Sequence, residues 1–416
     1  MEKPQRRPPK KSPKMGIRLI CAAAVLVLVG ILIFSLSGKK EPAPIDPTMS
    51  TTVSTAATEA TNATEPTAPA KTVIHYAAAG DLNVNDKTVA AGGDSYNYTD
   101  TFLDVAHLLA GADIASVNFE GNLCGEPYGA GGSAPQTLAE AMGKMGIDLV
   151  QMANSYSINK GISGLATSLN GIAAAGMEPV GAYATNKDFK AAKGYTIKNV
   201  RGIRIAFVAF TKGMDGMALP AGSENCVNVL YSDYDSAYQV VDEEGITSVI
   251  SAAKKEKPDL IVAMLHWGSE FNDTISKSQQ SIVELLQGSG VDAIIGTHSH
   301  YVQKVDYNPE TGKLVAYSLG DFFSDASRSG SEYSLVLDLE ITKDPTTGKT
   351  QITNYSYTPI FTVNELENEV QKPLKVVRLT EAMAAYESGY IDKVSPETFA
   401  KMQYALTRID ARVKGE

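Results

Sequence analysis

Two histidines stand one residue apart after a short apolar run, in the segment "DAIIGTHSHYVQ" at 292–303. The run reaches Gly296, which is the pattern of a buried strand followed by the loop that leaves its C-terminal end. On an extended segment the rings of His298 and His300 would face opposite sides. In a turn, both rings can be brought around one site, either with each contacting a different ion or with one touching the substrate. Strand ends of this kind are where open α/β folds build their sites.

Other strand-like runs also end in side chains that can bind metal ions. Carboxylate oxygens and imidazole nitrogens gathered in one place suit divalent ions such as Mn²⁺, Fe²⁺ or Zn²⁺. The repetition of such side chains at the same end of successive strands favours a metal centre. The residues concerned are Asp81, Asn118 and Glu120 in "NFEG", Asn154 in "ANS", His266 and Glu270 in "HWGSEF", and Asp321 in "SLGDFF".

Each of these residues taken alone also has a structural interpretation. Asp81 and Asn154 can cap the turns that follow them, and Glu270 can be a solvated loop acid. His75 falls within a strand-like run and His107 within a helical pattern, so both are expected to be structural. If all the polar residues served only the fold, several carboxylates and imidazoles would be buried side by side with no ion, which is costly.

The elements that must position these side chains alternate between strands and helices from Val73 onward, which predicts an α/β fold. A β-hairpin is expected at 333–361, with its turn at "KDPTTGK". The tail from about Thr380 is expected to form two amphipathic helices. The strands are expected at 72–81, 112–121, 147–155, 178–182, 203–211, 259–268, 292–300 and 314–323, and the helices at 101–111, 133–146, 164–176, 243–257 and 276–290.

The N-terminal segment has a different character. An apolar run at 17–38 is close to the length of about 20 residues that a membrane-spanning helix needs. Basic residues are concentrated before it, so the positive-inside rule predicts a cytoplasmic tail at 1–16 and places the rest of the chain outside the cell. A cleaved signal peptide is the alternative, because Ser35 and Ser37 are small enough for a cleavage site. The Thr/Ala/Pro-rich segment at 39–71 is expected to be a disordered stalk.

Charge and cysteine content exclude some classes of function. The chain has a net charge of −10, and its first forty residues are strongly basic, so the remainder is more acidic still. An acidic body repels polyanions at long range, which argues against a nucleic-acid partner. Cys124 and Cys226 are the thiols beyond the apolar run. An extracytoplasmic setting permits a disulfide between them without demanding one.

Five blocks in order resemble the capsule-synthesis protein CapA family, the poly-γ-glutamate capsule proteins of bacteria. They are "AAGDLNVND", "VNFEGNL", "HWGSEF", "IIGTHSHYVQ" and "AYSLGDFF", and the resemblance covers roughly residues 72–330. That family looks related to calcineurin-like binuclear metallophosphoesterases. The resemblance implies a four-layer α/β/β/α sandwich over 72–365, with two mixed sheets face to face and the site at the strand ends. It leaves residues 366–416 as a C-terminal helical extension.

The resemblance also assigns roles to the strand-end residues. They are metal ligands (Asp81, Glu120, His266, His298 and His300), catalytic groups (His298, Glu270 and Tyr156) and substrate-binding groups (Asn118, Asn154 and Asp321).

One block departs from the family pattern. The family reads A-N-N-H-S-x-D-x-G, whereas this chain has "ANSYSINKG". Ser155 replaces an expected metal ligand, Tyr156 replaces the histidine that would protonate a leaving group, and Asn159 replaces the acid that would orient it. A tyrosine hydroxyl has an ordinary pKa near 10 and is a poor acid–base group at neutral pH.

The sequence therefore supports two functions. In the first, the protein is anchored in the cell membrane by one helix. Its extracytoplasmic domain acts in the synthesis, export or attachment of an anionic capsule polymer such as poly-γ-glutamate, beside other membrane-bound capsule-synthesis proteins. In the second, it is a metal-dependent phosphoesterase-type hydrolase or transferase acting on a cell-surface substrate. The chain has no G-x-x-x-x-G-K-[ST] motif, so any ATP-driven ligation of the polymer belongs to another polypeptide.

Overall fold

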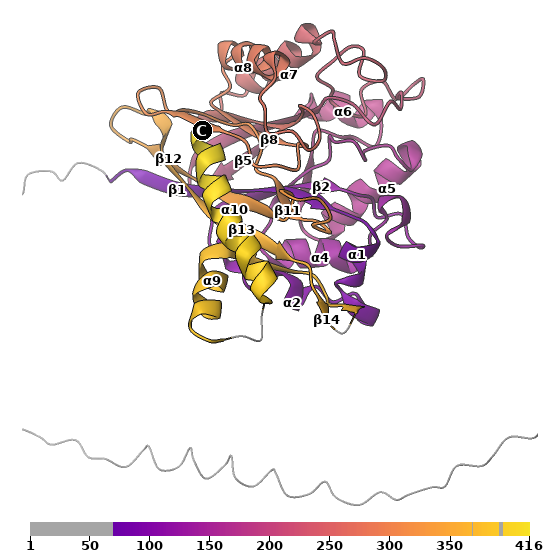
Figure 1. Cartoon of the computed structure of the whole chain (residues 1–416). Helices are drawn as coiled ribbons and strands as arrows, with labels where there is room; N and C mark the ends of the chain where they lie inside the picture. Colours follow the sequence, from indigo (N-terminus) through magenta and orange to yellow (C-terminus); the bar gives the residue numbers. More distant parts are fainter. Residues whose placement is uncertain (1–69, 368, 391–393) are drawn as a thin grey trace, which may run out of the picture. The chain divides into compact units, whose positions relative to one another are not determined.

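The computed structural model describes residues 70–367, 369–390 and 394–416 (Figure 1). The expected tail at 1–16, the expected membrane span at 17–38 and nearly all of the expected stalk at 39–71 lie outside these ranges. Within them, no helix combines the length and apolar character that crossing a membrane requires.

The described residues form two large mixed sheets, as the predicted α/β alternation requires. The larger has eight strands in the order β16-β13-β12-β1-β2-β3-β4, with β11 paired to β1. Strands β1 to β4 are parallel, and the β12–β13 hairpin predicted from the sequence adds antiparallel strands beside β1. Its strands are β1 (Thr72–Asn83), β2 (Ile114–Glu120), β3 (Leu149–Gln151), β4 (Glu178–Val180), β11 (Asp321–Phe323), β12 (Tyr333–Lys343), β13 (Thr350–Val363) and β16 (Lys375–Arg378).

The smaller sheet has six strands in the order β5-β6-β7-β8-β10-β9. Strands β6, β7, β8 and β10 are parallel, and β5 and β9 close its two edges as antiparallel strands. A short separate ribbon pairs β14 (Leu366–Glu367) with β15 (Val370–Gln371). The six strands are β5 (Tyr195–Val200), β6 (Ile203–Thr211), β7 (Leu260–His266), β8 (Ala293–Thr297), β9 (Val305–Asn308) and β10 (Lys313–Ala316).

Helices cover the outer faces of both sheets (Figure 1). Helices α7 and α8 lie over the smaller sheet, whereas α2, α4 and α9 lie beyond the larger one. Helix α10 packs along β12 and β13 and also reaches β9 of the other sheet. The helices are α1 (Asp86–Ala90), α2 (Thr99–Phe102), α3 (Ala106–Ala110), α4 (Gln136–Lys144), α5 (Gly161–Ala174), α6 (Asn186–Ala192), α7 (Glu243–Lys255), α8 (Lys277–Ser289), α9 (Leu379–Glu387) and α10 (Pro396–Lys414), with 3₁₀ turns at Gly93–Ser95 and Ala130–Gly132.

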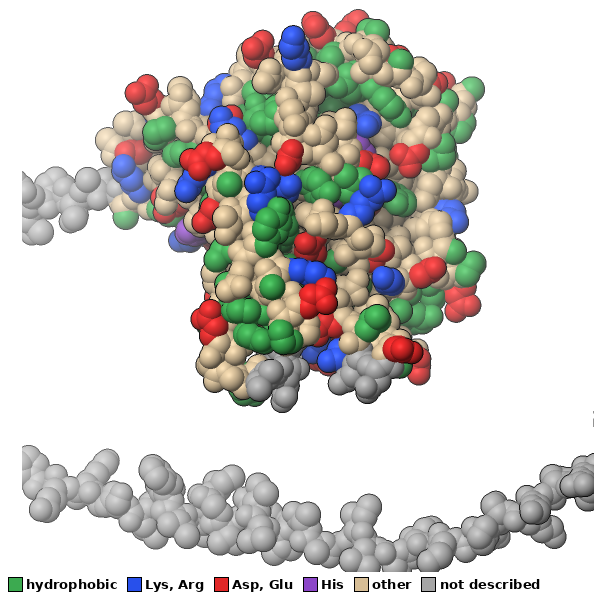
Figure 2. Space-filling view, viewed as in Figure 1, with side chains coloured by type: hydrophobic (Ala, Val, Ile, Leu, Met, Phe, Trp, Pro, Cys, Tyr) green, Lys and Arg blue, Asp and Glu red, His purple; other side chains and the backbone are tan. Residues whose placement is uncertain are grey.

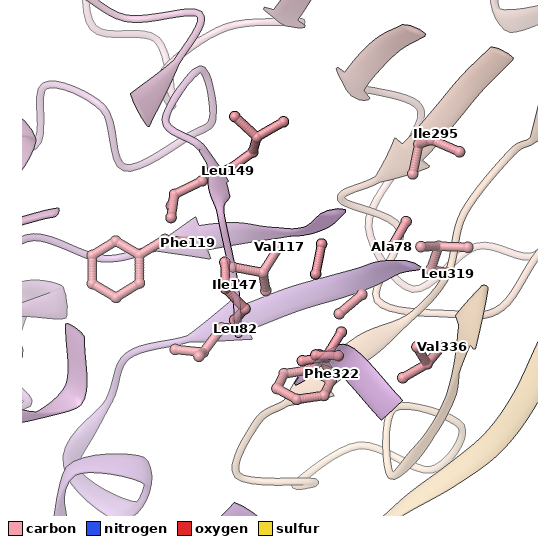
Figure 3. Packing of buried hydrophobic residues seen from close by; sticks show 14 of the residues in the cluster. Ala78, Leu82, Val117, Phe119, Ile147, Leu149, Ile295, Leu319, Phe322 and Val336 are labelled. Carbon is pink, nitrogen blue, oxygen red and sulfur yellow. The ribbon is translucent and has the colours of Figure 1, made fainter. Parts of the chain in front are cut away.

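The core lies between the sheets, and strand alternation decides which side chains enter it. In β6, Phe207 faces the larger sheet, where its ring meets Tyr76 of β1 at 5.5 Å. Its neighbour Val208 points the other way, into the apolar layer beneath α7 and α8. Buried side chains of β1, β2, β8 and β11 belong to one large apolar cluster (Figure 3). Because both faces of the small sheet are buried at its centre, the parallel strands β6, β7 and β8 read as nearly continuous apolar runs in the sequence.

Three predictions differ from the structure. The run 314–323, predicted as one strand, divides into β10 and β11, which belong to different sheets. The division occurs at Gly320, whose φ of +79° turns the chain from one sheet to the other. The predicted helix at 101–111 is two short helices, α2 and α3. The segment 366–416, expected to be helical, also contributes β16 to the larger sheet.

Candidate metal centre

The first group of possible ligands joins both sheets. Glu120 ends β2, His266 ends β7 and His298 follows β8, and one ligand atom from each lies within 4.8 Å of the others. His266 Nδ1 is 3.3 Å from Glu120 Oε1, and the rings of His266 and His298 are 4.3 Å apart. All three side chains are buried.

The second group consists of Asp81, His300 and Asp321, again with ligand atoms within 4.8 Å of one another. The register of β1 and β11 places Asp81 beside Asp321. His300 Nδ1 lies 2.8 Å from Asp321 Oδ1 and 3.9 Å from Asp81 Oδ2. Asp321, expected to bind substrate, thus also lies among the candidate metal ligands.

The loop after β8 sends its two histidines to different groups. His298 and His300 have φ values of +88° and +59°, in the left-handed region that residues other than glycine rarely adopt. The backbone N–H of His298 donates to Asp81 Oδ2 at 2.9 Å, which holds the loop in this conformation. Strained backbone of this kind is typical of functional sites. The "HSH" spacing thus supplies one imidazole to each group.

Asn118 connects the two groups. Its Nδ2 donates to Asp81 Oδ1 at 2.6 Å and lies 3.3 Å from Glu120 Oε1. Asn154 Nδ2 in turn donates to Asn118 Oδ1 at 3.0 Å. Both asparagines are buried, and their hydrogen bonds position the carboxylates, whereas their role in binding substrate stays a prediction. The two groups therefore form one centre.

The block that departs from the family pattern borders the first group. Ser155 Oγ lies 3.1 Å from His266 Nε2, so a hydroxyl contacts the imidazole here. Tyr156 packs its ring against Gly132 in the 3₁₀ turn. Burial, with help from nearby carboxylates, raises the pKa of Tyr156 to about 12. The phenol stays protonated at neutral pH, so it can donate a hydrogen bond but cannot serve as a general base.

Burial dominates the electrostatics of the centre. It raises the pKa of Asp81 to about 6 and that of Glu120 well above its ordinary value, and it lowers the pKa of His266 and His298. Burial also opposes charging of His300, but the Asp321 carboxylate prevails and raises the pKa of His300 to about 11. The His300 imidazolium favours the charged form of Asp81, but burial together with the neighbouring Asp321 carboxylate outweighs it.

These residues fit a divalent cation. His298 Nε2 is buried and has no hydrogen-bond partner within the described ranges, as expected of a nitrogen that awaits a ligand. The oxygen and nitrogen donors suit Mn²⁺, Fe²⁺ or Zn²⁺. A cation would also offset the cost of burying several carboxylates together.

Two charged side chains border the centre. Glu270, predicted to be catalytic, is exposed, and its charge contributes to raising the pKa of Glu120 and Tyr156. Lys212, not predicted from the sequence, follows β6 and donates from Nζ to Gly268 O at 3.1 Å. Its ammonium contributes to lowering the pKa of His266 and His298. Its position directly after a buried strand was the signal that could have identified it.

The other two histidines and the described cysteines, Cys124 and Cys226, lie outside the centre. His75 bonds Asp338 on the surface, and His107 is exposed on α3. Cys124 and Cys226 are both free thiols, so the structure contains no disulfide between them.

Sequence comparison finds clear relatives. The family model described as "Bacterial capsule synthesis protein PGA_cap" matches residues 75–326. The PGA biosynthesis protein CapA of Bacillus subtilis is 28% identical over 210 residues, which is 50% of this chain and 50% of that protein. The capsule biosynthesis protein CapA of Bacillus anthracis is 27% identical over 196 residues, 46% of this chain and 44% of that one. The chain thus spans about half the length of the curated relatives it matches.

Structure comparison finds similar solved proteins. The calcineurin-like phosphoesterase YfkN from Bacillus subtilis matches with a TM-score of 0.41 and 16% identity over 81% of this chain and 100% of that one. A phosphatase from Mycoplasma pneumoniae matches with a TM-score of 0.40 and 14% identity, over 70% of this chain and 95% of that one.

Proposed function

Because this chain belongs to the bacterial capsule synthesis protein family, we propose that it is a membrane-anchored, extracytoplasmic protein that holds an anionic capsule polymer during synthesis, export or attachment. The names of its relatives, which describe biosynthesis of PGA and of capsule, support poly-γ-glutamate as the polymer. The basic tail and apolar run of residues 1–38 support the anchor. The proposal includes the four-layer sandwich of metallophosphoesterase type and partnership with other membrane-bound capsule-synthesis proteins.

The observation that carries the proposal is the buried pair of ligand groups joined by Asn118. Glu120, His266 and His298 would hold one cation, and Asp81, His300 and Asp321 a second. A bound cation would supply positive charge to which the carboxylates of the polymer can bind. This resolves an apparent conflict, since an acidic protein can then accept an anionic ligand locally.

The residues of the chain have distinct tasks in this binding. Asn118 and Asn154 fix the carboxylates, and the Asp81–His298 hydrogen bond fixes the loop that presents the imidazoles. Lys212 places an ammonium beside the same centre, where it attracts an approaching carboxylate. Tyr156 keeps its proton and can donate a hydrogen bond to a ligand oxygen.

A binding measurement tests this function. The purified full chain is loaded with Mn²⁺, Fe²⁺ or Zn²⁺, its metal content is measured, and retention of poly-γ-glutamate is compared with and without EDTA. We expect retention that EDTA abolishes and that His298→Ala reduces at least tenfold. His107→Ala, at an exposed helix position, is the matched control and should behave as wild type. Metal-loaded protein that retains no polymer would contradict the proposal.

A metal-dependent hydrolase or transferase is the second candidate, favoured by the adjacency of the two ligand groups. Asn118 Nδ2 lies within 3.3 Å of carboxylate oxygens from both groups, and paired cations are suited to phosphoryl chemistry. The Tyr156 block opposes it, because loss of a positioned general acid typically lowers the rate about 10²- to 10⁴-fold. Manganese-dependent cleavage of a generic phosphodiester by wild-type protein, abolished by His298→Ala, would reject a purely binding role.

A further inference from the structure

A second concentration of charge lies where α10 meets the segment that follows His300. A cavity of about 290 Å³ opens there, and its walls include Arg408 and Arg412 from α10 together with Gln303, Lys304 and Asp273. We call it the arginine pocket. Arg408 and Arg412 are four residues apart, so they share one face of the helix. Figure 2 views the molecule from the side that carries α10, where Lys and Arg side chains lie beside acidic ones.

Arg412 is held rigidly but is incompletely satisfied. Its side chain is only 10% exposed, and Nη2 donates to Asp273 Oδ2 at 3.1 Å. The guanidinium carbon lies 4.9 Å from the centre of the Tyr301 ring and 5.5 Å from that of Tyr333. Contacts with ring faces fix the guanidinium without using its in-plane donors. Nε and Nη1 are buried and have no hydrogen-bond partner in the described part of the chain.

Arg408 adds a second guanidinium, which also has a nitrogen without a hydrogen-bond acceptor in the described part of the chain. Its Nη2 lies 3.6 Å from the Asp273 oxygen that Arg412 uses, and its Nε is also buried without a partner among the described residues. A single carboxylate therefore serves two guanidiniums. Lys304 is already paired with Asp306 at 2.6 Å, and Glu416 at the cavity wall is exposed. Buried donors that lack an acceptor are costly, so the pocket is built for an anion.

Gln303 indicates which kind of anion. Its Nε2 donates to Asn272 O at 2.9 Å, which orients the amide. Its Oε1 is then a buried acceptor with no donor in the described ranges. A ligand that carries both a carboxylate and an amide N–H would satisfy the arginines and Gln303 together. Phosphate offers no N–H and would bring oxygens toward Gln303 Oε1 and Asp273.

We propose that the arginine pocket binds a carboxylate that stands close to an amide N–H, the chemistry of an N-acylated acidic amino acid. Its identification as one glutamyl unit of a capsule polymer rests on the function proposed above, whereas the ligand chemistry rests on the pocket alone. Helix α10, which supplies Arg408 and Arg412, lies beyond residues 75–326, which the family model matches, whereas Asp273, Gln303 and Lys304 lie within them.

The pocket adjoins the metal centre through an aromatic layer. The ring of Phe271 stacks on His300 at 4.9 Å and meets Tyr301 at 5.9 Å, and the guanidinium of Arg412 lies over the Tyr301 ring. A polymer held with one unit in the arginine pocket therefore has neighbouring units close to the centre. Two sites on one ligand raise the effective affinity without a new contact.

Calorimetric titration of the full chain tests the pocket. The probes are N-acetylglutamate, acetate and inorganic phosphate, each in EDTA so that no metal contributes. We expect N-acetylglutamate to bind most tightly, and Arg412→Gln and Arg408→Gln each to weaken it at least tenfold, the typical effect of losing a charge-assisted hydrogen bond. Arg201→Gln, which removes an exposed arginine paired with Asp113, is the matched control and should bind as wild type.

Unchanged affinity in the Arg408 variant, the more exposed of the two and the safer to fold, overturns the proposal. Phosphate binding as tight as N-acetylglutamate binding overturns it as well. Failure of the pocket and failure of the proposed function are distinguishable. Metal-dependent polymer retention that survives in both arginine variants would refute the proposed pocket and support the proposed function. Arginine-dependent binding of N-acetylglutamate by a chain that retains no polymer would support the proposed pocket and refute the proposed function.

Discussion

Asp81 Oδ2 accepts a hydrogen bond from the backbone N–H of His298 at 2.9 Å, although 217 residues separate them in the chain. Asp81 belongs to the larger sheet, whereas His298 follows β8 of the smaller one. The carboxylate therefore ties the sheets together at the same point where it could bind a cation. Removing its charge and removing its hydrogen bond should have different consequences.

Asp81→Asn keeps the size and one acceptor but removes the charge. We expect Mn²⁺ to raise the thermal unfolding midpoint of this variant less than that of wild-type protein, because the second ligand group loses a carboxylate whereas the first keeps its ligands. In EDTA, Asp81→Ala should lower the free energy of unfolding by about 1–3 kcal/mol, since the His298 N–H is then buried without a partner. Asp81→Asn should lower the free energy of unfolding by less than Asp81→Ala does. A manganese shift as large in Asp81→Asn as in wild type would contradict a metal site at Asp81.

The double change Ser155→Asn and Tyr156→His restores the residues that the family pattern places beside the centre. If their absence is what limits hydrolysis, the variant should cleave a phosphodiester with Mn²⁺ about 10²-fold faster than wild type, the lower range for a positioned general acid. The rate is measured with a chromogenic diester. Adding His298→Ala should abolish the gain. A double variant no faster than wild type would show that the centre lacks more than these two side chains.

Gly80 allows β1 and β11 to approach closely. A Cβ atom at this position would lie 1.8 Å from Gly320 O, which accepts the hydrogen bond of the Asp81 N–H. We expect Gly80→Ala to destabilise the protein by at least about 3 kcal/mol, in the range of severe core defects, in urea unfolding. Gly288→Ala is the control, because that helical position has open space around it, and it should stabilise by up to about 1 kcal/mol. Equal changes in the free energy of unfolding for Gly80→Ala and Gly288→Ala would contradict the steric role of Gly80.

His75 provides a pH-dependent contact remote from the centre. Its hydrogen bond to Asp338 at 2.8 Å raises the pKa of His75, although burial opposes the shift. A raised folded pKa means that the pair stabilises the protein fully below the ordinary value near 6.5 and that this contribution is lost as pH rises through the folded value. The pair is partly exposed, so the contribution should be below about 1 kcal/mol.

Titration of His75 by NMR checks this prediction. The Asp338→Asn variant should return the midpoint toward 6.5, and the stability difference between wild type and variant should be larger at pH 5.5 than at pH 9. A difference independent of pH would mean that the pair contributes through packing alone.

The sequence identified most of the buried strands because both faces of the smaller sheet are covered, which leaves uninterrupted apolar runs such as that of β7. It also indicated that polar side chains follow those runs. It did not show that the run 314–323 changes sheets, because apolar residues continue across the Gly320 turn. Nor did it show that Asp321 lies beside Asp81, which belongs to a strand far away in the chain.

The sequence by itself determined the family, the α/β alternation and the residue types at the strand ends, since these depend on local periodicity and on motifs that are contiguous in the chain. Only the tertiary structure decided how the strand-end residues divide into two ligand groups and which side chains merely position them. It alone revealed the pocket of Arg408 and Arg412, because two arginines on an amphipathic helix look like a solvated face until Asp273, Tyr301 and Gln303 are folded against them. Contacts between residues more than a hundred positions apart leave no periodic signal in the chain that makes them.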